Sequence, residues 1–392
     1  MSGYIRKRGK RADGSTKWQA RYWDASDPTK RYEKVFRRKD DAERWLVQQS
    51  NAQLTGTHID PRNADRPFRE VVDAWKETWV DLEPKTKAGY ESIIEKRLLP
   101  EFGSRKVSGI TTTLVQKYVN RLSAEGLSPA TVRNVYACMR TALNAAVAHR
   151  QILVNPCLGV KLPRMRREEM LFLEADEVRA LADAITPYYR VLILTAAYTG
   201  LRAGELLALR RADVDLLRGV LHVRQALKDV NGRLYFGPTK THAQRTVSLP
   251  RFLRDELEAH LSRPLPGGNG PDALVFPGPQ GGPLRHGNFY RRHFRTAVSA
   301  ALPAAKHGLR FHDLRHTCAS LSIAAGAHPK LISARLGHSS IQITLDRYGH
   351  LLPGVEEALA DALDIAFVAA SSPSTTVCEL GRQAEGQMLA TR

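Results

Sequence analysis

The chain has 392 residues, and 59 Lys or Arg against 40 Asp or Glu give it a formal net charge of +19 at pH 7. This charge favours a polyanionic partner, and a hydrophobic content of 43% argues against global disorder. No stretch approaches the roughly 20 apolar residues of a membrane span, so we expect a soluble protein of two or three domains. The cysteines lie far apart, which fits neither a zinc knuckle nor a disulfide framework and favours a reducing, intracellular setting. They are Cys138, Cys157, Cys318 and Cys378.

Residues 4–38 alternate polar side chains with aromatic or β-branched ones. Turn signals stand at Asp13-Gly14 and Asp27-Pro28. This pattern predicts a small three-stranded sheet, and a helix is expected after it at 40–53.

Positive charge is concentrated in this first segment. Residues 1–39 hold 13 Lys or Arg and four acidic residues, so they carry about half of the excess charge of the whole chain. We interpret residues 1–60 as a β-domain that binds DNA; the alternative is a solvated basic sheet whose charge only aids solubility. The side chains expected to contact DNA are Arg6, Lys7, Arg8, Lys17 and Arg21.

Apolar residues recur at helical spacing between 66 and 160 in four groups, which predicts four helices. Ser128-Pro129 is typical of a helix start, because serine caps a helix and proline is tolerated at the first helical position. We expect this helical domain to face DNA as well, although solvated helix faces would explain its charges almost equally well. The basic residues concerned are Lys85, Lys87, Arg133 and Arg140.

A third segment begins near Met170, after a linker that contains Asn155-Pro156 and Pro163. Its pattern predicts a mainly helical domain over 170–367 with a small antiparallel sheet, so the chain as a whole is a multidomain α+β protein. Residues 371–392 have the composition of a flexible tail. Helices are expected at 175–185, 188–199, 203–210, 251–261, 289–300, 313–325, 328–336 and 355–367, and strands at 220–226, 233–237 and 245–249, with a hairpin turn at Asn231-Gly232.

Four strings of this third segment carry unusual residues. They are TGLRAGEL at 199–206, PTKTHAQRTVSLP at 238–250, HDLRHT at 312–317 and LGHSS at 336–340, and Tyr348 follows the last histidine by ten residues. In this order they resemble the tyrosine recombinase family of the phage-integrase type. The resemblance covers essentially the whole chain, because such integrases have an arm-site-binding β-domain (here 1–60), a helical core-site-binding domain (66–160) and a catalytic domain (170–367).

The resemblance implies six catalytic residues: Arg202, Lys240, His312, Arg315, His338 and Tyr348. Two guanidinium groups match the charge that a phosphodiester gains in its transition state, so no metal ion or other cofactor is needed. Tyr348 would attack the phosphate and form a 3′-phosphotyrosyl link.

The other residues would move protons or hold groups in place. Lys240 would protonate the departing 5′-oxygen, His312 would manage the tyrosine proton and His338 would bind the phosphate. Glu205 would orient a cation of the site. Lys228 and Arg245 lie in the same hairpin region as Lys240 and stay open as alternatives to it, whereas His316 is expected to be a structural neighbour.

Other interpretations remain open for these residues. Each of them taken alone fits an ordinary surface or capping role. His312 and His316 are also four residues apart, as zinc ligands on a helix are, but Arg315 between them would repel a cation. A type IB topoisomerase would use the same tyrosine chemistry, and a catalytically inactive DNA-binding regulator would retain the fold.

The resemblance also implies partners. Four copies would assemble on double-stranded DNA attachment sites and exchange strands through a Holliday junction. An arm-site domain favours an integrase of a phage or mobile element, for which an excisionase and a host DNA-bending protein are expected. The setting would be the bacterial cytoplasm, on nucleoid DNA, and the helix at 355–367 would pack either on its own chain or on a neighbouring copy.

Overall fold

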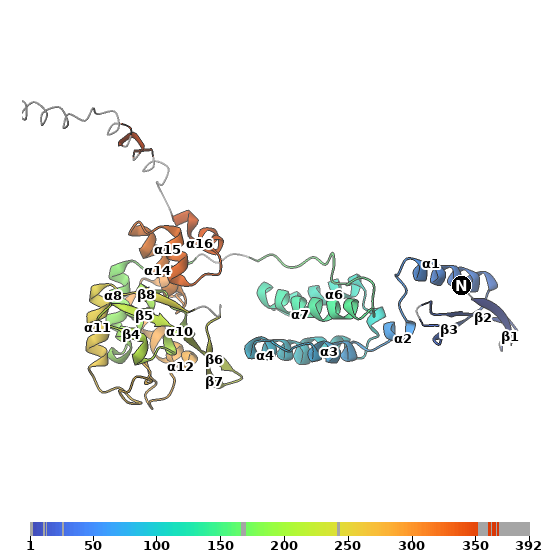
Figure 1. Cartoon of the computed structure of the whole chain (residues 1–392), viewed down its shortest axis with the longest axis horizontal. Coiled ribbons are helices and arrows are strands. Elements are labelled where there is room, and N and C mark those ends of the chain that lie inside the picture. Colours follow the sequence, from blue (N-terminus) through green and yellow to red (C-terminus); the bar gives the residue numbers. More distant parts are fainter. Residues whose placement is uncertain are drawn as a thin grey trace, which may run out of the picture. The chain divides into compact units, whose positions relative to one another are not determined.

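The structure is a computed structural model of the chain, and it describes residues 3–10, 12, 14–25, 27–165, 170–240, 244–351, 360–361, 363–365 and 367. The chain forms two compact units, Met1–Glu168 and Glu169–Arg392. Figure 1 shows the helices and strands of both units. In the described residues, no helix is both long and apolar enough to cross a lipid bilayer.

The first unit begins with the predicted three-stranded sheet. Strands β1 (Tyr4–Lys10), β2 (Thr16–Trp23) and β3 (Arg31–Phe36) are antiparallel in that order, and α1 (Lys39–Leu54) follows. Trp45 of α1 packs on Tyr22 and Phe36, with ring centroids 5.2 and 5.6 Å apart, so α1 covers the face of the sheet that carries these two rings. The opposite face has the basic residues of β2 and is not covered by α1.

Helices make up the rest of the first unit, as the four apolar groups predict. They are α2 (Pro61–Ala64), α3 (Phe68–Glu77), α4 (Pro84–Ile93), α5 (Leu99–Phe102), α6 (Thr112–Ala124) and α7 (Pro129–Ala148), with a π turn at Ile94–Leu98 and a 3-10 turn at Val107–Gly109. The Ser128 hydroxyl accepts a hydrogen bond from the Thr131 backbone N–H and caps α7, as expected from the sequence. Phe68, Phe102 and Met139 are among the fully buried side chains that join these helices.

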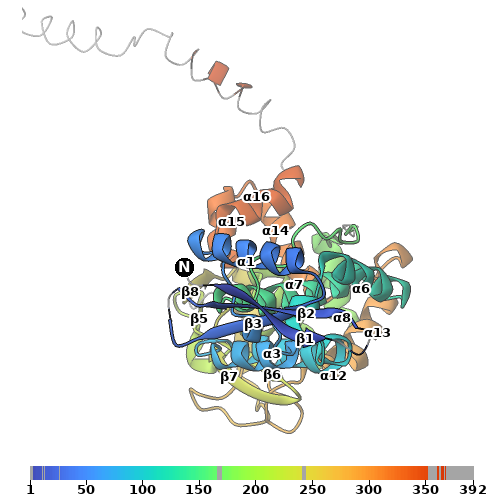
Figure 2. The same cartoon turned by 90° about the vertical axis from the view of Figure 1, so that its right-hand side faces the viewer.

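The second unit is mainly helical. Its helices are α8 (Ala175–Ala184), α9 (Arg190–Thr199), α10 (Ala203–Leu207), α11 (Arg251–Leu261), α12 (His286–Phe289), α13 (Arg295–Ala301), α14 (Asp313–Ala324), α15 (Pro329–Leu336) and α16 (Ile341–Tyr348). Short 3-10 turns lie at Pro187–Tyr189, Arg211–Asp213, Ala304–Lys306 and Gly349–Leu351, and a π turn lies at Tyr290–Phe294. Figures 1 and 2 both show α14, α15 and α16 together at one end of this unit.

Two small antiparallel sheets accompany these helices. One has the order β4-β5-β8 (Val214–Asp215, Val220–Val223, Arg245–Ser248), and the other pairs β6 (Gln225–Val230) with β7 (Arg233–Pro238). Asn231 and Gly232, at the predicted hairpin turn, both have positive φ, 51° and 82°, as the two central residues of a type I′ turn do.

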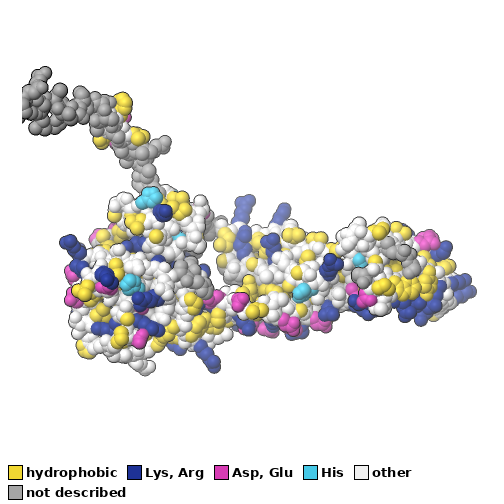
Figure 3. Space-filling view, viewed as in Figure 1, with side chains coloured by type: hydrophobic (Ala, Val, Ile, Leu, Met, Phe, Trp, Pro, Cys, Tyr) yellow, Lys and Arg dark blue, Asp and Glu magenta, His cyan; other side chains and the backbone are white. Residues whose placement is uncertain are grey.

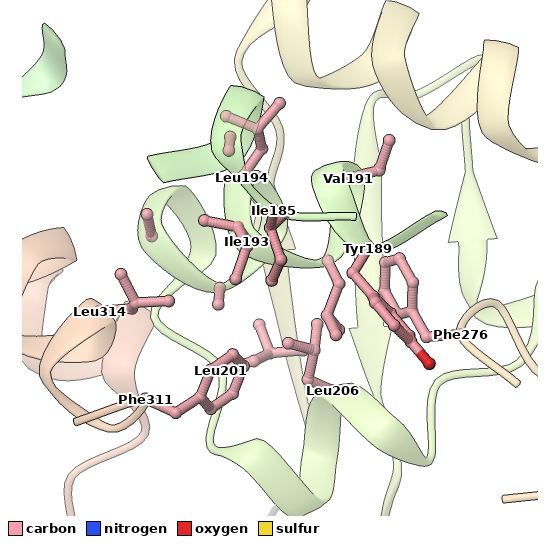
Figure 4. Packing of buried hydrophobic residues seen from close by; sticks show 14 of the residues in the cluster. Ile185, Tyr189, Val191, Ile193, Leu194, Leu201, Leu206, Phe276, Phe311 and Leu314 are labelled. Carbon is pink, nitrogen blue, oxygen red and sulfur yellow. The ribbon is translucent and has the colours of Figure 1, made fainter. Parts of the chain in front are cut away.

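Helix α9 forms the centre of the second unit. Its residues from Val191 to Ala197 are all buried, because the helix is apolar on every side and is surrounded by α8, α11 and α14. Figure 4 shows Ile193 of α9 packed near Leu201, Leu206 and Leu314. The segment that leaves α9 at Gly200 therefore starts from the buried core of this unit.

Several predicted bounds differ from the observed ones. The single strand expected at 220–226 is two strands in different sheets, and the helix expected at 203–210 ends at Leu207. Helix α16 and strand β4 were not expected. Most of the helix expected at 355–367 lies outside the described residues. The described residues within that range, 360–361, 363–365 and 367, are helical. The expected tail at 371–392 also lies outside them.

Candidate active site

The turn between α9 and α10 positions Arg202. Gly200 ends α9 with φ +66°, and a Cβ at this position would collide with the Leu336 side chain and crowd Cys318. Glycine is therefore required both for the left-handed backbone and for the close approach of α14 and α15. Arg202 then caps α10, and its backbone N–H donates to Glu205 Oε2 at 2.9 Å.

Glu205 joins two arginines. Its Oε1 accepts from Arg202 Nη1 at 2.9 Å, and its two oxygens accept from Arg245 Nη1 and Nη2 at 3.1 and 2.7 Å. The carboxylate is only 1% exposed, so it is a buried anion compensated by two cations. Burial works to raise the pKa of Glu205, but the hydrogen bonds and charge of Arg245, together with Arg202, outweigh it and hold that pKa below its ordinary value.

Arg202 is the more accessible of the two arginines. Its second guanidinium nitrogen, Nη2, donates to the Gly337 carbonyl at 3.0 Å, and the side chain is 23% exposed. Arg245 is 10% exposed, and its Nε donates to the Arg335 carbonyl at 3.1 Å. Arg202 is thus held in place with part of its side chain open to solvent, while Arg245 is more deeply buried.

Arg315 lies on the first turn of α14 and is 4% exposed. Its Nη1 donates to the Gly200 carbonyl at 2.6 Å, which ties α14 to the turn that carries Arg202. Burial, and then the positive charge of Arg202, lower the pKa of Arg315 to about 10, so the group stays charged at neutral pH.

His338 follows α15 and is half-buried. Its Nδ1 shares a hydrogen bond of 2.9 Å with the Thr344 hydroxyl of α16. Burial, then Arg315 and Arg202, lower the pKa of His338 to about 4, so the imidazole is neutral at pH 7.

Tyr348, at the end of α16, is 1% exposed. Its hydroxyl lies 2.6 Å from Nδ1 of His316, which is itself 4% exposed. Burial raises the pKa of Tyr348 to about 12, although the charge of Arg315 acts in the opposite direction. The tyrosine therefore contacts the second histidine of HDLRHT, which the sequence indicated only as a structural neighbour.

His312 immediately precedes α14 and is exposed. Its ring meets that of His316 edge-on, with centroids 5.2 Å apart, because the two residues are one helical turn apart. Partial burial, and then Arg315, lower the pKa of His312. In the described part of the chain, no group of three or more His, Cys, Asp or Glu is arranged to hold a metal ion.

Arg315 links five of the six predicted catalytic residues: its charge acts on His312, His338 and Tyr348, and Arg202 acts on it. Lys240 is exposed, lies two residues after the end of β7 and is followed by residues 241–243, which are not among the described residues. Of its alternatives, Arg245 is committed to Glu205 and Lys228 lies within β6.

The first sheet carries the candidate DNA-binding side chains on both of its faces. Arg6 pairs with Gln19 and Tyr4 with Arg21 across the strands, so Arg6 and Arg21 lie on the face that α1 leaves open, and Lys17 shares it by alternation. The charge of Arg8 acts on Glu33, which belongs to the same face by register. Lys7 pairs with Trp18, on the face that α1 covers. Figure 3 shows Lys and Arg side chains gathered at the end of this domain.

In the helical part of the first unit, the candidate DNA-binding residues differ in their surroundings. Lys85 and Lys87 in the first turn of α4, and Arg140 of α7, are exposed. Arg133 is half-buried, and its Nε donates to the Pro163 carbonyl at 3.1 Å. Arg133 therefore already has a structural partner.

Comparison with known proteins identifies similar families and folds. Residues 171–354 match the model of the phage integrase family, and residues 67–123 match that of the phage integrase N-terminal SAM-like domain. A putative prophage phiRv2 integrase of Mycobacterium tuberculosis is 30% identical over 359 residues, covering 89% of this chain and 92% of the relative.

Two solved structures share the fold at lower identity. The Tn1549 transposon integrase in complex with transposon right end DNA is 20% identical with a TM-score of 0.65, over 77% of this chain and 100% of that chain. A lambda integrase tetramer bound to a Holliday junction is 21% identical with a TM-score of 0.53, over 85% and 91% of the two chains. The match to the prophage relative extends over nearly the whole of both sequences, and the chain belongs to the phage integrase family of tyrosine recombinases.

Proposed function

We propose that this protein is a site-specific recombinase that integrates and excises a phage or mobile element, with Tyr348 as its nucleophile. The observation that carries the proposal is the group of charged and titratable side chains around Arg315. Arg202, His312, His338 and Tyr348 all interact with it electrostatically, although they come from separate strings of the sequence.

The cations of this site suit a phosphodiester. Arg202, Arg245 and Arg315 lie around the buried Glu205, and Arg347 and Asp313 also act on the titratable groups of the site, so positive charge is in excess. Arg202 is more exposed than Arg245 and Arg315, and a guanidinium has five N–H donors, so Arg202 is the arginine best placed to bind a non-bridging oxygen. Removing one such donor commonly reduces a rate by about 100- to 1,000-fold.

In the proposed reaction, Tyr348 Oη attacks the scissile phosphorus while the bond from phosphorus to the 5′-oxygen breaks. The product is a 3′-phosphotyrosyl bond, and Lys240 gives a proton to the released 5′-oxygen. His312, exposed at the edge of the site, is the proposed acceptor of the tyrosine proton, and His338 the proposed hydrogen-bond donor to the phosphate. Attack by a free 5′-hydroxyl of the partner strand reverses the sequence and rejoins the DNA.

We further propose that four copies act together on paired DNA sites. The lambda integrase tetramer bound to a Holliday junction has the same fold and supports this arrangement. A type IB topoisomerase is not favoured, because the relative that matches the chain over nearly its full length is an integrase. The sheet of residues 1–60 would bind arm-type sites through its open face, and residues 66–160 would bind the core site. An excisionase and a host DNA-bending protein are the accessory partners we expect, on nucleoid DNA of the bacterial cytoplasm.

The decisive experiment is covalent capture of DNA. The purified chain is incubated with a library of nicked duplexes, the mixture is denatured, and the DNA that remains bound is sequenced. We expect the wild-type chain to retain one family of sites and Tyr348→Phe to retain none, while both bind duplex DNA equally well without denaturation. Adducts formed by Tyr348→Phe would reject the nucleophile, and relaxation of supercoiled DNA without paired sites would favour a topoisomerase. A wild-type chain that forms no adduct would favour a DNA-binding regulator.

A further inference from the structure

Helix α16 is attached to the second unit by few side chains. Of its eight residues only Thr344 and Tyr348 are buried, and they lie on the same face because they are one turn apart. Ile341 and Leu345 are 40% and 39% exposed. The Tyr348 ring belongs to a small apolar cluster that is separate from the main core of this unit.

Both buried side chains of α16 carry a hydroxyl that is bound to a histidine. Thr344 Oγ1 lies 2.9 Å from His338 Nδ1, and Tyr348 Oη lies 2.6 Å from His316 Nδ1. Two hydroxyl–histidine hydrogen bonds therefore hold the helix that ends in the candidate nucleophile.

The observed position of Tyr348 is not a reactive one. At 1% exposure the side chain is enclosed by protein, whereas attack requires its oxygen to come within about 3.5 Å of phosphorus. The hydroxyl must therefore leave His316 before it can reach a DNA phosphate.

His316 is also poorly suited to act as the base in this position. Burial, and then His312, lower the pKa of His316 to about 4, while burial raises that of Tyr348 to about 12. Both shifts disfavour proton transfer from the phenol to the imidazole across the 2.6 Å contact. The contact holds a neutral phenol and does not generate the phenolate.

We propose that His316 is a positioning residue that keeps Tyr348 in a buried resting position, and that DNA cleavage requires α16 to give up this contact. The inference deepens the proposed function and rests on Tyr348 being the nucleophile. His338 supplies the link to DNA, because it holds Thr344 of the same helix and is the proposed ligand of the phosphate. Phosphate binding at His338 thus acts on the helix that must move.

The test uses the full chain without DNA. Tyrosines are nitrated with tetranitromethane and located by mass spectrometry of tryptic peptides. Cleavage after Arg347 isolates Tyr348 from the other eleven of the 12 tyrosines, because the sequence has none beyond it. Buried Tyr189, 4% exposed, is the internal reference for an intact fold.

We expect His316→Leu, which keeps the volume and removes the hydrogen bond, to nitrate at Tyr348 about tenfold faster than the wild type. His316→Asn, whose amide places a hydrogen-bonding atom near the position of Nδ1, should restore protection. Thr344→Val is the matched change at the other contact and should speed nitration of Tyr348 as well. Equal protection of Tyr348 in His316→Leu and wild type would overturn the proposal.

A second measurement decides the matter if His316→Leu also exposes Tyr189. Tyr348→Phe retains the ring and removes only the hydroxyl, so the proposal predicts about tenfold faster amide hydrogen exchange in α16 with α9 unchanged. Unchanged exchange in α16 would overturn the role of His316. These measurements involve no DNA. Failure to form covalent adducts would therefore reject the recombinase mechanism but not the contact between His316 and Tyr348, and unchanged nitration and exchange would reject the role of His316 but not the recombinase mechanism.

Discussion

Replacing Glu205 by Gln tests the electrostatic design of the site. The change preserves shape but removes the negative charge that Arg202 and Arg245 share, and it turns one acceptor into a donor facing their N–H groups. Breaking a buried ion pair by removing one partner costs about 3 kcal/mol or more, and at 1% exposure solvent does not screen this carboxylate. For a unit of this size, about 3 kcal/mol lowers the melting temperature by roughly 6–12 °C.

The assay is thermal unfolding of Glu205→Gln and wild type at several pH values. The pKa of Glu205 is lowered from 4.5 in the folded protein, so its ionisation stabilises the fold fully above pH 4.5, and this contribution is lost as the pH falls through the folded pKa. The difference between the two proteins should thus be largest at pH 7 and shrink in acid. Glu256→Gln is the matched control, because Glu256 pairs with Arg190 at 32% exposure and should cost no more than about 1 kcal/mol. Equal losses for both variants, or a pH-independent loss for Glu205→Gln, would refute the reasoning.

Two further changes separate catalysis from binding. Arg202→Lys should slow single-turnover adduct formation by about 100-fold while duplex binding changes little, because an ammonium cannot reproduce the bidentate geometry. Arg210→Lys serves as the control. A normal rate of adduct formation in Arg202→Lys would remove Arg202 from the site. Replacing Arg6 and Arg8 together by Ala should flatten the salt dependence of binding to a random-sequence duplex by about two units of log–log slope, measured by fluorescence anisotropy. Lys7 lies on the face that α1 covers, so Lys7→Ala should change the slope less than the double replacement of Arg6 and Arg8 does. A slope for Lys7→Ala that is as flat as that of the double variant would contradict the assignment of the binding face.

Much of the architecture follows from local patterns. The three-stranded sheet, the four groups of helices in the first unit and the hairpin at Asn231 were predictable because apolar periodicity and turn chemistry act within a few residues. Helix α16 was not, because it is short and its first turns contain Ile341, Ile343 and Thr344, whose β-branched side chains do not favour a helix. Tertiary contacts through Thr344 and Tyr348 stabilise it instead. The break at Arg224 between β5 and β6 was equally invisible, because a change of sheet leaves the apolar pattern intact.

The site was predictable to a different degree. The four sequence motifs predicted the catalytic residues. They could not predict that Tyr348 is buried, since its burial depends on α14 and α15 folding against α16. They also placed His316 beside Arg315 without a role. One signal was available: His312 and His316 are four residues apart, so both imidazoles lie on one side of α14. That spacing raised the possibility of zinc, whereas the structure shows His316 in contact with a tyrosine.

Burial first, and then the charge of neighbouring arginines, lowers the pKa of the imidazoles of His312 and His338 in the free site. Burial is the main reason that the pKa of His338 falls to about 4, and the positive charges of Arg315 and Arg202 also oppose its protonation. A phosphate diester brings a negative charge into the same space and so removes part of that opposition, which raises the pKa of a nearby histidine. Bound DNA therefore makes protonation of His338 less unfavourable than it is in the free site. The anion that the arginines attract thus also favours a charged hydrogen-bond donor at His338.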